Sequence, residues 1–150
     1  MDHLEVDEDR MGKMTRRLFT TTALLGAVPA LAEDAPVTLR GKLTQAEGKP
    51  PALTLADGRA VLLEGDEQTT GVLHDQRLKD IDFEAIGYLE GDSKLRILPI
   101  HKRALYVHQN GKRLYVTYWC EVCAIRTYTP GTCWCCQDDT ALDLREKLDN

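Results

Sequence analysis

The five cysteines of this 150-residue chain all fall in one short stretch near its C-terminal end: Cys120, Cys123, Cys133, Cys135 and Cys136. Without Cys135 they form the pattern C-x2-C, nine residues, C-x2-C. Each C-x2-C pair places two sulfurs on one tight turn, and two such turns supply the four thiolates of a tetrahedral metal site. Pro130-Gly131 favours the turn that returns the chain toward the first pair. The predicted metal ligands are Cys120, Cys123, Cys133 and Cys136.

Cys135 is left over as a free thiol or as a neighbour of the ligands, because a structural zinc site takes four. Two other uses of these cysteines stay open: two disulfides with one unpaired thiol, or a redox-active or iron–sulfur site. Cys135 and Cys136 are adjacent and do not readily bridge to each other without strain, which favours a metal. Four thiolates without a histidine select zinc or an iron–sulfur centre over hard cations. We expect zinc, with an iron–sulfur centre or copper as alternatives.

Residues 1–32 have the pattern of a signal peptide. Arg16-Arg17 is followed by a short apolar stretch over residues 20–28 and by Ala30-Leu31-Ala32, a small-x-small cleavage site. The apolar stretch is too short to span a bilayer, which takes about 20 residues. Residues 15–19, TRRLF, resemble the twin-arginine export motif, whose pathway carries folded cargo and so permits a metal to be loaded first.

We therefore expect a single exported β-domain over residues 33–150, in the periplasm or elsewhere outside the cytoplasm. The acidic stretch at residues 1–10 is unusual ahead of a signal peptide: it is either a long n-region or lies before a true start at Met11 or Met14, and we favour the later start. Within the domain, residues 119–140 form the expected metal-binding segment, which we call the cysteine segment.

From Val37 onward, apolar and polar residues mostly alternate, as is typical of half-buried β-strands. Asp57-Gly58 and Asn110-Gly111 mark two tight hairpins, because these pairs readily adopt positive φ angles. The expected strands lie at residues 37–43, 53–55, 60–63, 83–89, 94–100, 104–107 and 113–119.

One short helix is expected, over residues 70–79. Three apolar residues should lie on its inner face and two polar residues on its outer face: Val72, Leu73 and Leu78 inside, Asp75 and Gln76 outside.

The order of these elements resembles a small OB-like antiparallel barrel. The residues that carry the resemblance are the mid-strand Gly41, the Asp57-Gly58-Arg59 hairpin and the run GYLEGDSKLRI. The expected fold is thus mainly β: an OB-like barrel with one short helix and a C-terminal cysteine-rich cap. An unrelated antiparallel β-roll is the alternative.

The cysteine segment itself resembles a zinc ribbon, and more narrowly the heavy-metal-binding ribbon of bacterial metal-handling proteins. In that family an aromatic residue precedes C-x2-(His or Cys), and Pro-Gly-x-Cys-x2-Cys follows about ten residues later. The chain departs from the pattern at Cys123, where histidine is usual, and at Gln137, where glycine is usual; its intervening loop is one residue shorter, and Cys135 has no counterpart. The resemblance implies metal binding more than a role in metal transport.

Charge and motifs exclude several function classes. The net charge of −5 argues against a nucleic-acid footprint and against binding to anionic lipid. The sequence lacks a Ser/His/Asp ordering, a phosphate-binding glycine loop and a His-Glu-x-x-His motif. We therefore expect a non-enzymatic metal-binding protein, with a thiol-redox or electron-transfer protein or a metal-trafficking protein as alternatives.

Histidines and aromatic residues complete the set of candidate functional residues. His74, His101 and His108 have no partner at ligand spacing and are expected to be structural. Six aromatic residues concentrate near the cysteines and offer a possible surface for a protein partner, although packing is their more common use: Tyr106, Tyr115, Tyr118, Trp119, Tyr128 and Trp134.

Overall fold

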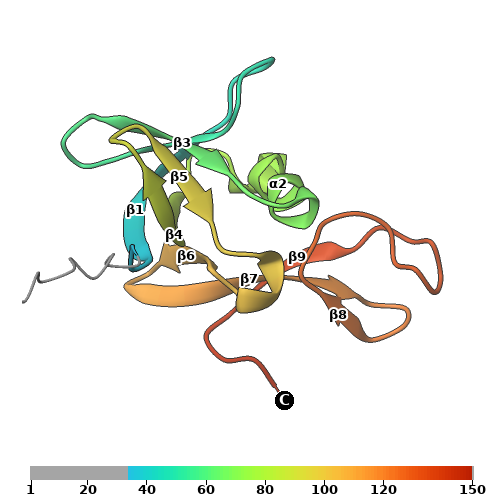
Figure 1. Cartoon of the computed structure of the whole chain (residues 1–150). Coiled ribbons are helices and arrows are strands. Elements are labelled where there is room, and N and C mark those ends of the chain that lie inside the picture. Colours follow the sequence, from blue (N-terminus) through green and yellow to red (C-terminus); the bar gives the residue numbers. More distant parts are fainter. Residues whose placement is uncertain (1–33, 150) are drawn as a thin grey trace, which may run out of the picture. The chain divides into compact units, whose positions relative to one another are not determined.

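The computed structural model describes residues 34–149, so the predicted leader lies outside the described residues. These residues contain nine strands, one α-helix and two short 3₁₀ helices (Figure 1). In chain order the elements are β1 (Val37–Thr44), β2 (Ala52–Thr54), β3 (Ala60–Glu64), α2 (Glu67–Leu73), η1 (Gln76–Leu78), β4 (Asp82–Glu90), β5 (Lys94–Ile97), η2 (Ile100–Lys102), β6 (Leu105–Gln109), β7 (Lys112–Cys120), β8 (Ile125–Thr127) and β9 (Ala141–Arg145).

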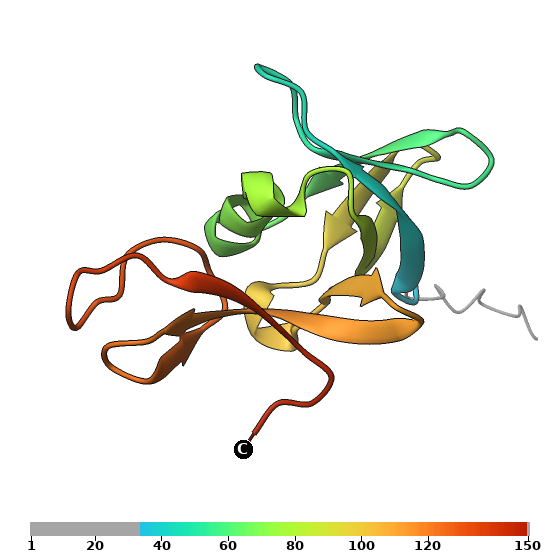
Figure 2. The same cartoon turned by 180° about the vertical axis from the view of Figure 1, so that it is seen from behind.

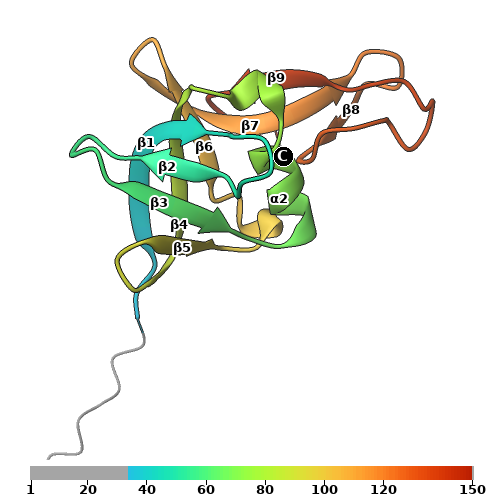
Figure 3. The same cartoon turned by 90° about the horizontal axis from the view of Figure 1, so that it is seen from above.

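The first five strands close into a barrel. They are hydrogen-bonded in the order β1-β2-β3-β5-β4, and β4 pairs again with β1. Four of these pairings are antiparallel, and the pairing of β3 with β5 is parallel. Figure 3 looks onto this arrangement, with α2 beside the strands. The predicted OB-like barrel with one short helix is confirmed.

Two glycines allow the barrel strands to approach one another closely. β1 pairs with β4 up to Lys42 and with β2 from Lys42 onward. A Cβ added at Gly41, where this change occurs, would lie under 3.0 Å from the carbonyl oxygen of Thr54. A Cβ at Gly87 would meet the carbonyl oxygen of Arg96 in the same way. Glycine is required at both positions because the nearby atoms belong to backbone, which cannot move aside.

The helix begins and ends earlier than the sequence suggested. α2 starts after Asp66, whose side chain accepts a hydrogen bond from the backbone N–H of Thr69 at 2.7 Å, a typical N-cap. It ends at Leu73, and the 3₁₀ helix η1 follows. The expected helix over residues 70–79 thus spans the end of one helix and the whole of the next.

For the helix expected over residues 70–79, the burial of the apolar residues was predicted correctly, but the exposure of Asp75 was predicted wrongly. Val72, Leu73 and Leu78 are fully buried in the core. Gln76 is exposed, as expected. Asp75, expected on the outside, is only 9% exposed, because its carboxylate is held by partners on η1 and β7.

The remaining strands extend the sheet from β4 toward the cysteines. One edge of β4 pairs with β1, and its other edge pairs first with β6, through Phe83–Ala85, and then with β5. β6 and β7 form the predicted hairpin around Asn110-Gly111. β7 then pairs with β8 and β9, neither of which was predicted. Figure 2, seen from behind, shows β9 running alongside β7 toward the C-terminus.

Candidate metal centre

Both C-x2-C sequences form the same backbone turn. In the first, the N–H of Ala124 donates to the carbonyl oxygen of Cys120 at 2.9 Å; in the second, the N–H of Gln137 donates to that of Cys133, also at 2.9 Å. Ala124 and Gln137 both have positive φ angles, 53° and 65°. The chain therefore builds two equivalent knuckles, although neither has glycine at the left-handed position that glycine favours.

Backbone N–H groups also point at the first sulfur of each knuckle. The N–H of Cys123 lies 3.4 Å from Sγ of Cys120. In the second knuckle, hydrogen bonds from the N–H groups of Cys136 and Cys135 lower the pKa of Cys133 to about 7. Such donors stabilise thiolate over thiol, and the thiolate is the form that binds a metal.

The two knuckles bring four sulfurs together. One Sγ from each of Cys120, Cys123, Cys133 and Cys136 lies within 4.8 Å of the others, and the Sγ atoms of Cys120 and Cys136 are 3.5 Å apart. A tetrahedral site with Zn–S bonds of about 2.3 Å requires sulfurs about 3.8 Å apart. All five cysteines are free thiols in this structure. The four predicted ligand cysteines thus form one convergent group that could hold a metal ion, rather than separate pairs.

Crowding of the sulfurs shifts the pKa of Cys123. The contact with Cys135 raises it most, and burial together with the sulfurs of Cys136 and Cys133 adds to the shift. Several thiols in one small space cannot all ionise easily, because thiolates repel one another. A bound cation would offset this repulsion between thiolates.

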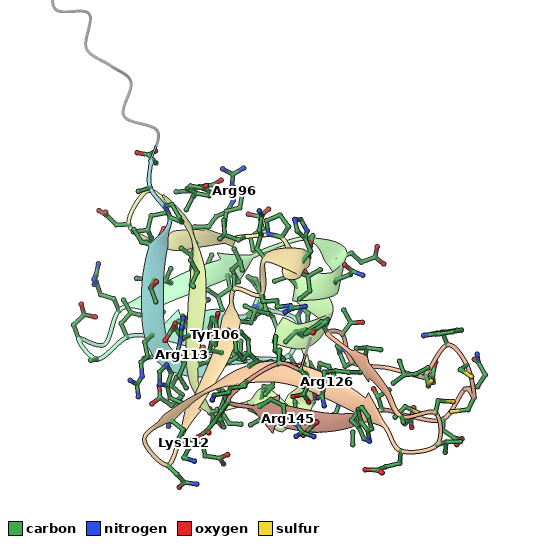
Figure 4. The ribbon with its side chains drawn as sticks, turned by 90° about the horizontal axis from the view of Figure 1, so that it is seen from below. Arg96, Tyr106, Lys112, Arg113, Arg126 and Arg145 are labelled. Carbon is green, nitrogen blue, oxygen red and sulfur yellow. The ribbon has the colours of Figure 1, made fainter. Side chains whose placement is uncertain are left out.

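The group is not equally covered on all sides. Cys120 and Cys133 are buried, at 1% and 0% exposed, whereas Cys123 and Cys136 are half-buried and Cys135 is exposed. The sulfur atoms drawn in Figure 4 gather in the two loops at one end of the molecule. The metal centre would therefore lie near the surface, with its more open side at Cys123 and Cys136.

Contacts outside the cysteines anchor this segment to the barrel. The hydroxyl of Tyr118 on β7 donates to Oδ2 of Asp75 at 2.9 Å, and Nε of Arg77 donates to Oδ1 of Asp75, also at 2.9 Å. Arg77 also reaches the carbonyl oxygen of Thr140 at 3.1 Å. The loop between α2 and β4 is thus bonded to the strand before the first knuckle and to the residue just before β9.

A half-buried arginine joins the three strands at the base of the segment. Arg126 on β8 donates from one nitrogen to Oγ1 of Thr117 on β7 and to Oδ2 of Asp143 on β9, each at 2.7 Å. Its guanidinium lies 5.1 Å from the ring centre of Trp119. The strands that position the knuckles are therefore held together without any contribution from the sulfurs.

His74, His101 and His108, the histidines of the described residues 34–149, do not belong to the four-cysteine group. Nε2 of His108 lies 2.6 Å from Oε2 of Glu84, a buried carboxylate that also accepts hydrogen bonds from Arg113. Arg113 covers the ring of Tyr106, 3.6 Å from its centre (Figure 4). This polar cluster lies where β4, β6 and the start of β7 pair, whereas Cys120 is at the end of β7. The expectation of a structural role for His108 fits this hydrogen bond.

The six aromatic residues near the cysteines are not equivalent. Tyr118 is fully buried in the core and Tyr106 is buried against Tyr115, with ring centres 4.9 Å apart. Trp134 is 74% exposed, and Val122 on the other knuckle is 68% exposed. Among residues 34–149 these two are the most exposed large hydrophobic side chains, and each lies between the two cysteines of one knuckle.

Comparisons with protein-family models, with curated proteins and with solved structures find no match for the chain. Within the described part of the chain, no helix has the length and apolar character needed to cross a membrane.

Proposed function

We propose that this protein is an exported, non-enzymatic metal-binding protein whose four clustered cysteines hold one zinc ion. The convergence of four sulfurs from two equivalent knuckles carries this proposal. Zinc suits a site of four thiolates because it has no geometric preference from d-electrons and accepts tetrahedral sulfur ligation. The role of the bound zinc would be structural: the ion would fix the two knuckles of a ribbon-like cysteine segment onto the end of the β7–β9 sheet.

Elemental analysis of freshly purified protein tests the metal. We expect one zinc per chain, lost when any of Cys120, Cys123, Cys133 or Cys136 is replaced by serine. Cys135→Ser is the matched control, since it removes a thiol from the same segment and should keep the metal. A protein without metal that has only one titratable thiol would support two disulfides and refute the proposal.

Export has its own test. The leader pattern at residues 1–32 supports transport out of the cytoplasm, so protein from a periplasmic fraction should begin near Glu33 by N-terminal sequencing. Replacing Arg16-Arg17 by Lys-Lys should stop export if the twin-arginine pathway is used. Cytoplasmic protein that retains the whole leader in the wild type would contradict the proposal.

A thiol-redox or electron-transfer protein is the second candidate, and the exposed thiol of Cys135 favours it. An iron–thiolate or iron–sulfur centre absorbs visible light, whereas a zinc protein is colourless. An absorption spectrum of protein purified without oxygen therefore separates the two functions. A metal-trafficking role, with zinc or copper, would require reversible binding.

A protein partner is proposed at the two knuckles. Trp134 and Val122 support this, because exposed large apolar side chains are common at protein interfaces.

A further inference from the structure

The two knuckles carry the most exposed large apolar side chains among residues 34–149. Trp134 is 74% exposed and Val122 is 68% exposed. The other exposed large apolar residues of the described chain, Leu62 and Leu89, are only 42% and 39% exposed. Both knuckle residues lie in loops rather than on strands. The fold therefore leaves its most exposed apolar surface beside the four sulfurs.

Both side chains can contact a single partner. The ligand sulfurs of the two knuckles lie within 4.8 Å of one another, so the loops that carry Val122 and Trp134 are next to each other. Figures 1 and 2 show these loops, which precede and follow β8, protruding at the same end of the domain. An interface of ordinary size covers about 800 Å² on each partner, which is enough to include both loops.

The exposed charge around these side chains has one sign. Arg126, the only base of the cysteine segment, is half-buried and paired with Asp143. Arg77, whose charge acts on Asp139, is already bonded to Asp75 and to the backbone of Thr140. Three exposed acids of the segment take part in no ion pair within the described residues: Glu121, Asp138 and Asp139. The exposed end of the cysteine segment is therefore both apolar and negative.

This combination distinguishes between three kinds of occupant. An anionic lipid surface and a second copy of this chain would each bring negative charge toward the three carboxylates, and like charges oppose association. A protein surface with an apolar pocket surrounded by lysine or arginine matches both features. The pocket would receive the indole of Trp134, and the surrounding bases would pair with the carboxylates.

We infer that the two knuckles dock onto a basic protein surface, with Trp134 as the main apolar contact. This inference rests on the protein partner proposed above and specifies its chemistry; it does not depend on which metal the cysteines bind. Tryptophan is enriched among the residues that dominate binding energy, whereas the charged rim chiefly sets the association rate and the choice of partner.

A phage-displayed library of random dodecapeptides without cysteine or histidine is the probe, because its members cannot bind a metal through thiolate or imidazole. It is selected on the mature protein as purified. We expect the enriched peptides to have a net positive charge and apolar residues. Their affinity should fall about tenfold in Trp134→Ala, since exposed tryptophans are frequent hot spots. Their affinity should also fall as salt rises from about 0.05 to about 0.3 M, since salt screens exposed charges.

Matched controls separate the knuckles from the rest of the surface. Leu89→Ala also truncates an exposed apolar side chain, but on β4, and should leave the affinity unchanged. Asp138→Asn combined with Asp139→Asn should weaken binding by about threefold, since each exposed ion pair contributes little. Glu47→Gln combined with Asp92→Asn removes two exposed acids outside the cysteine segment and should have no effect.

Selected peptides that are neutral or acidic, that bind Trp134→Ala as well as wild type, or that lose as much affinity in Leu89→Ala would each overturn the inference. Sedimentation of the protein with vesicles of phosphatidylcholine and phosphatidylglycerol would overturn it in favour of a membrane. A dimer that Trp134→Ala dissociates would overturn it in favour of a second copy. Zinc is measured on the same samples, so the two proposals fail separately: protein without zinc that still binds basic peptides through Trp134 refutes the metal alone.

Discussion

Tyr118→Phe removes one hydroxyl group and nothing else from the contact that joins the cysteine segment to the barrel. The ring is fully buried, so phenylalanine fills the same space. The hydroxyl donates to the ionised Asp75 at 2.9 Å, and hydrogen bonds to charged groups contribute about 1.5–3 kcal/mol. Asp75 keeps its bonds from Arg77, so we expect the lower part of this range, a decrease of about 1.5–2 kcal/mol in the free energy of unfolding.

This cost should depend on pH. Burial opposes ionisation of Asp75, but hydrogen bonds from Arg77 and Tyr118 outweigh it and hold the Asp75 pKa below its ordinary value of 3.8. The contribution of the carboxylate is therefore complete above pH 3.8 and is lost as the pH falls through the lowered pKa of the folded state. The difference between Tyr118→Phe and wild type should shrink accordingly in acid.

Urea denaturation followed by circular dichroism at pH 7 and at a series of lower pH values measures both effects, with an unchanged m-value expected. Tyr88→Phe is the control, because no hydrogen bond of the Tyr88 hydroxyl is found among residues 34–149 and its contact with Arg96 involves the ring. A cost below about 0.5 kcal/mol at pH 7, or a cost that does not decrease at any lower pH at which the protein still folds, would refute the reasoning.

Two further substitutions test the backbone. Gln137→Gly should raise the free energy of unfolding of the zinc-loaded protein by about 0.5–1 kcal/mol. Gln137 has a left-handed conformation, which costs an L-residue about 1–2 kcal/mol and costs glycine almost nothing. Part of this stabilisation is lost because glycine also increases the conformational entropy of the unfolded chain. Chemical denaturation checks this, and a stability below that of wild type would contradict it. Gly87→Ala should lower the stability by about 3 kcal/mol, because its Cβ would overlap the carbonyl oxygen of Arg96. An unchanged melting temperature would show that β4 and β5 can separate without cost.

Features set by neighbouring residues could be predicted from the sequence. The Asp57-Gly58 and Asn110-Gly111 hairpins depend on local φ preferences, and the structure has positive φ at Gly58, Asn110 and Gly111. The C-x2-C knuckles are local as well, so their spacing indicated which four sulfurs would converge. The strand expected over residues 94–100 ends at Ile97, before Pro99.

Features that depend on distant partners could not be predicted in this way. Asp75 was placed outside because a polar residue near a helix usually faces solvent; its partner Tyr118 lies 43 residues further along the chain. β9 is different, because the sequence there contains a pattern that predicts a strand. Leu142 and Leu144 are half-buried, and they alternate with polar residues as in any half-buried strand.

The position of β9 in the chain has a consequence for the order of folding. β9 follows every cysteine, so it leaves the ribosome after the whole cysteine segment, and β7 cannot pair with it before that segment has been made. Closing that loop costs conformational entropy, which falls when the loop is already compact. Zinc that binds the nascent knuckles would hold the ends of the loop near each other before the strands meet. The ion would then act first as a guide for strand pairing and only afterwards as part of the finished protein.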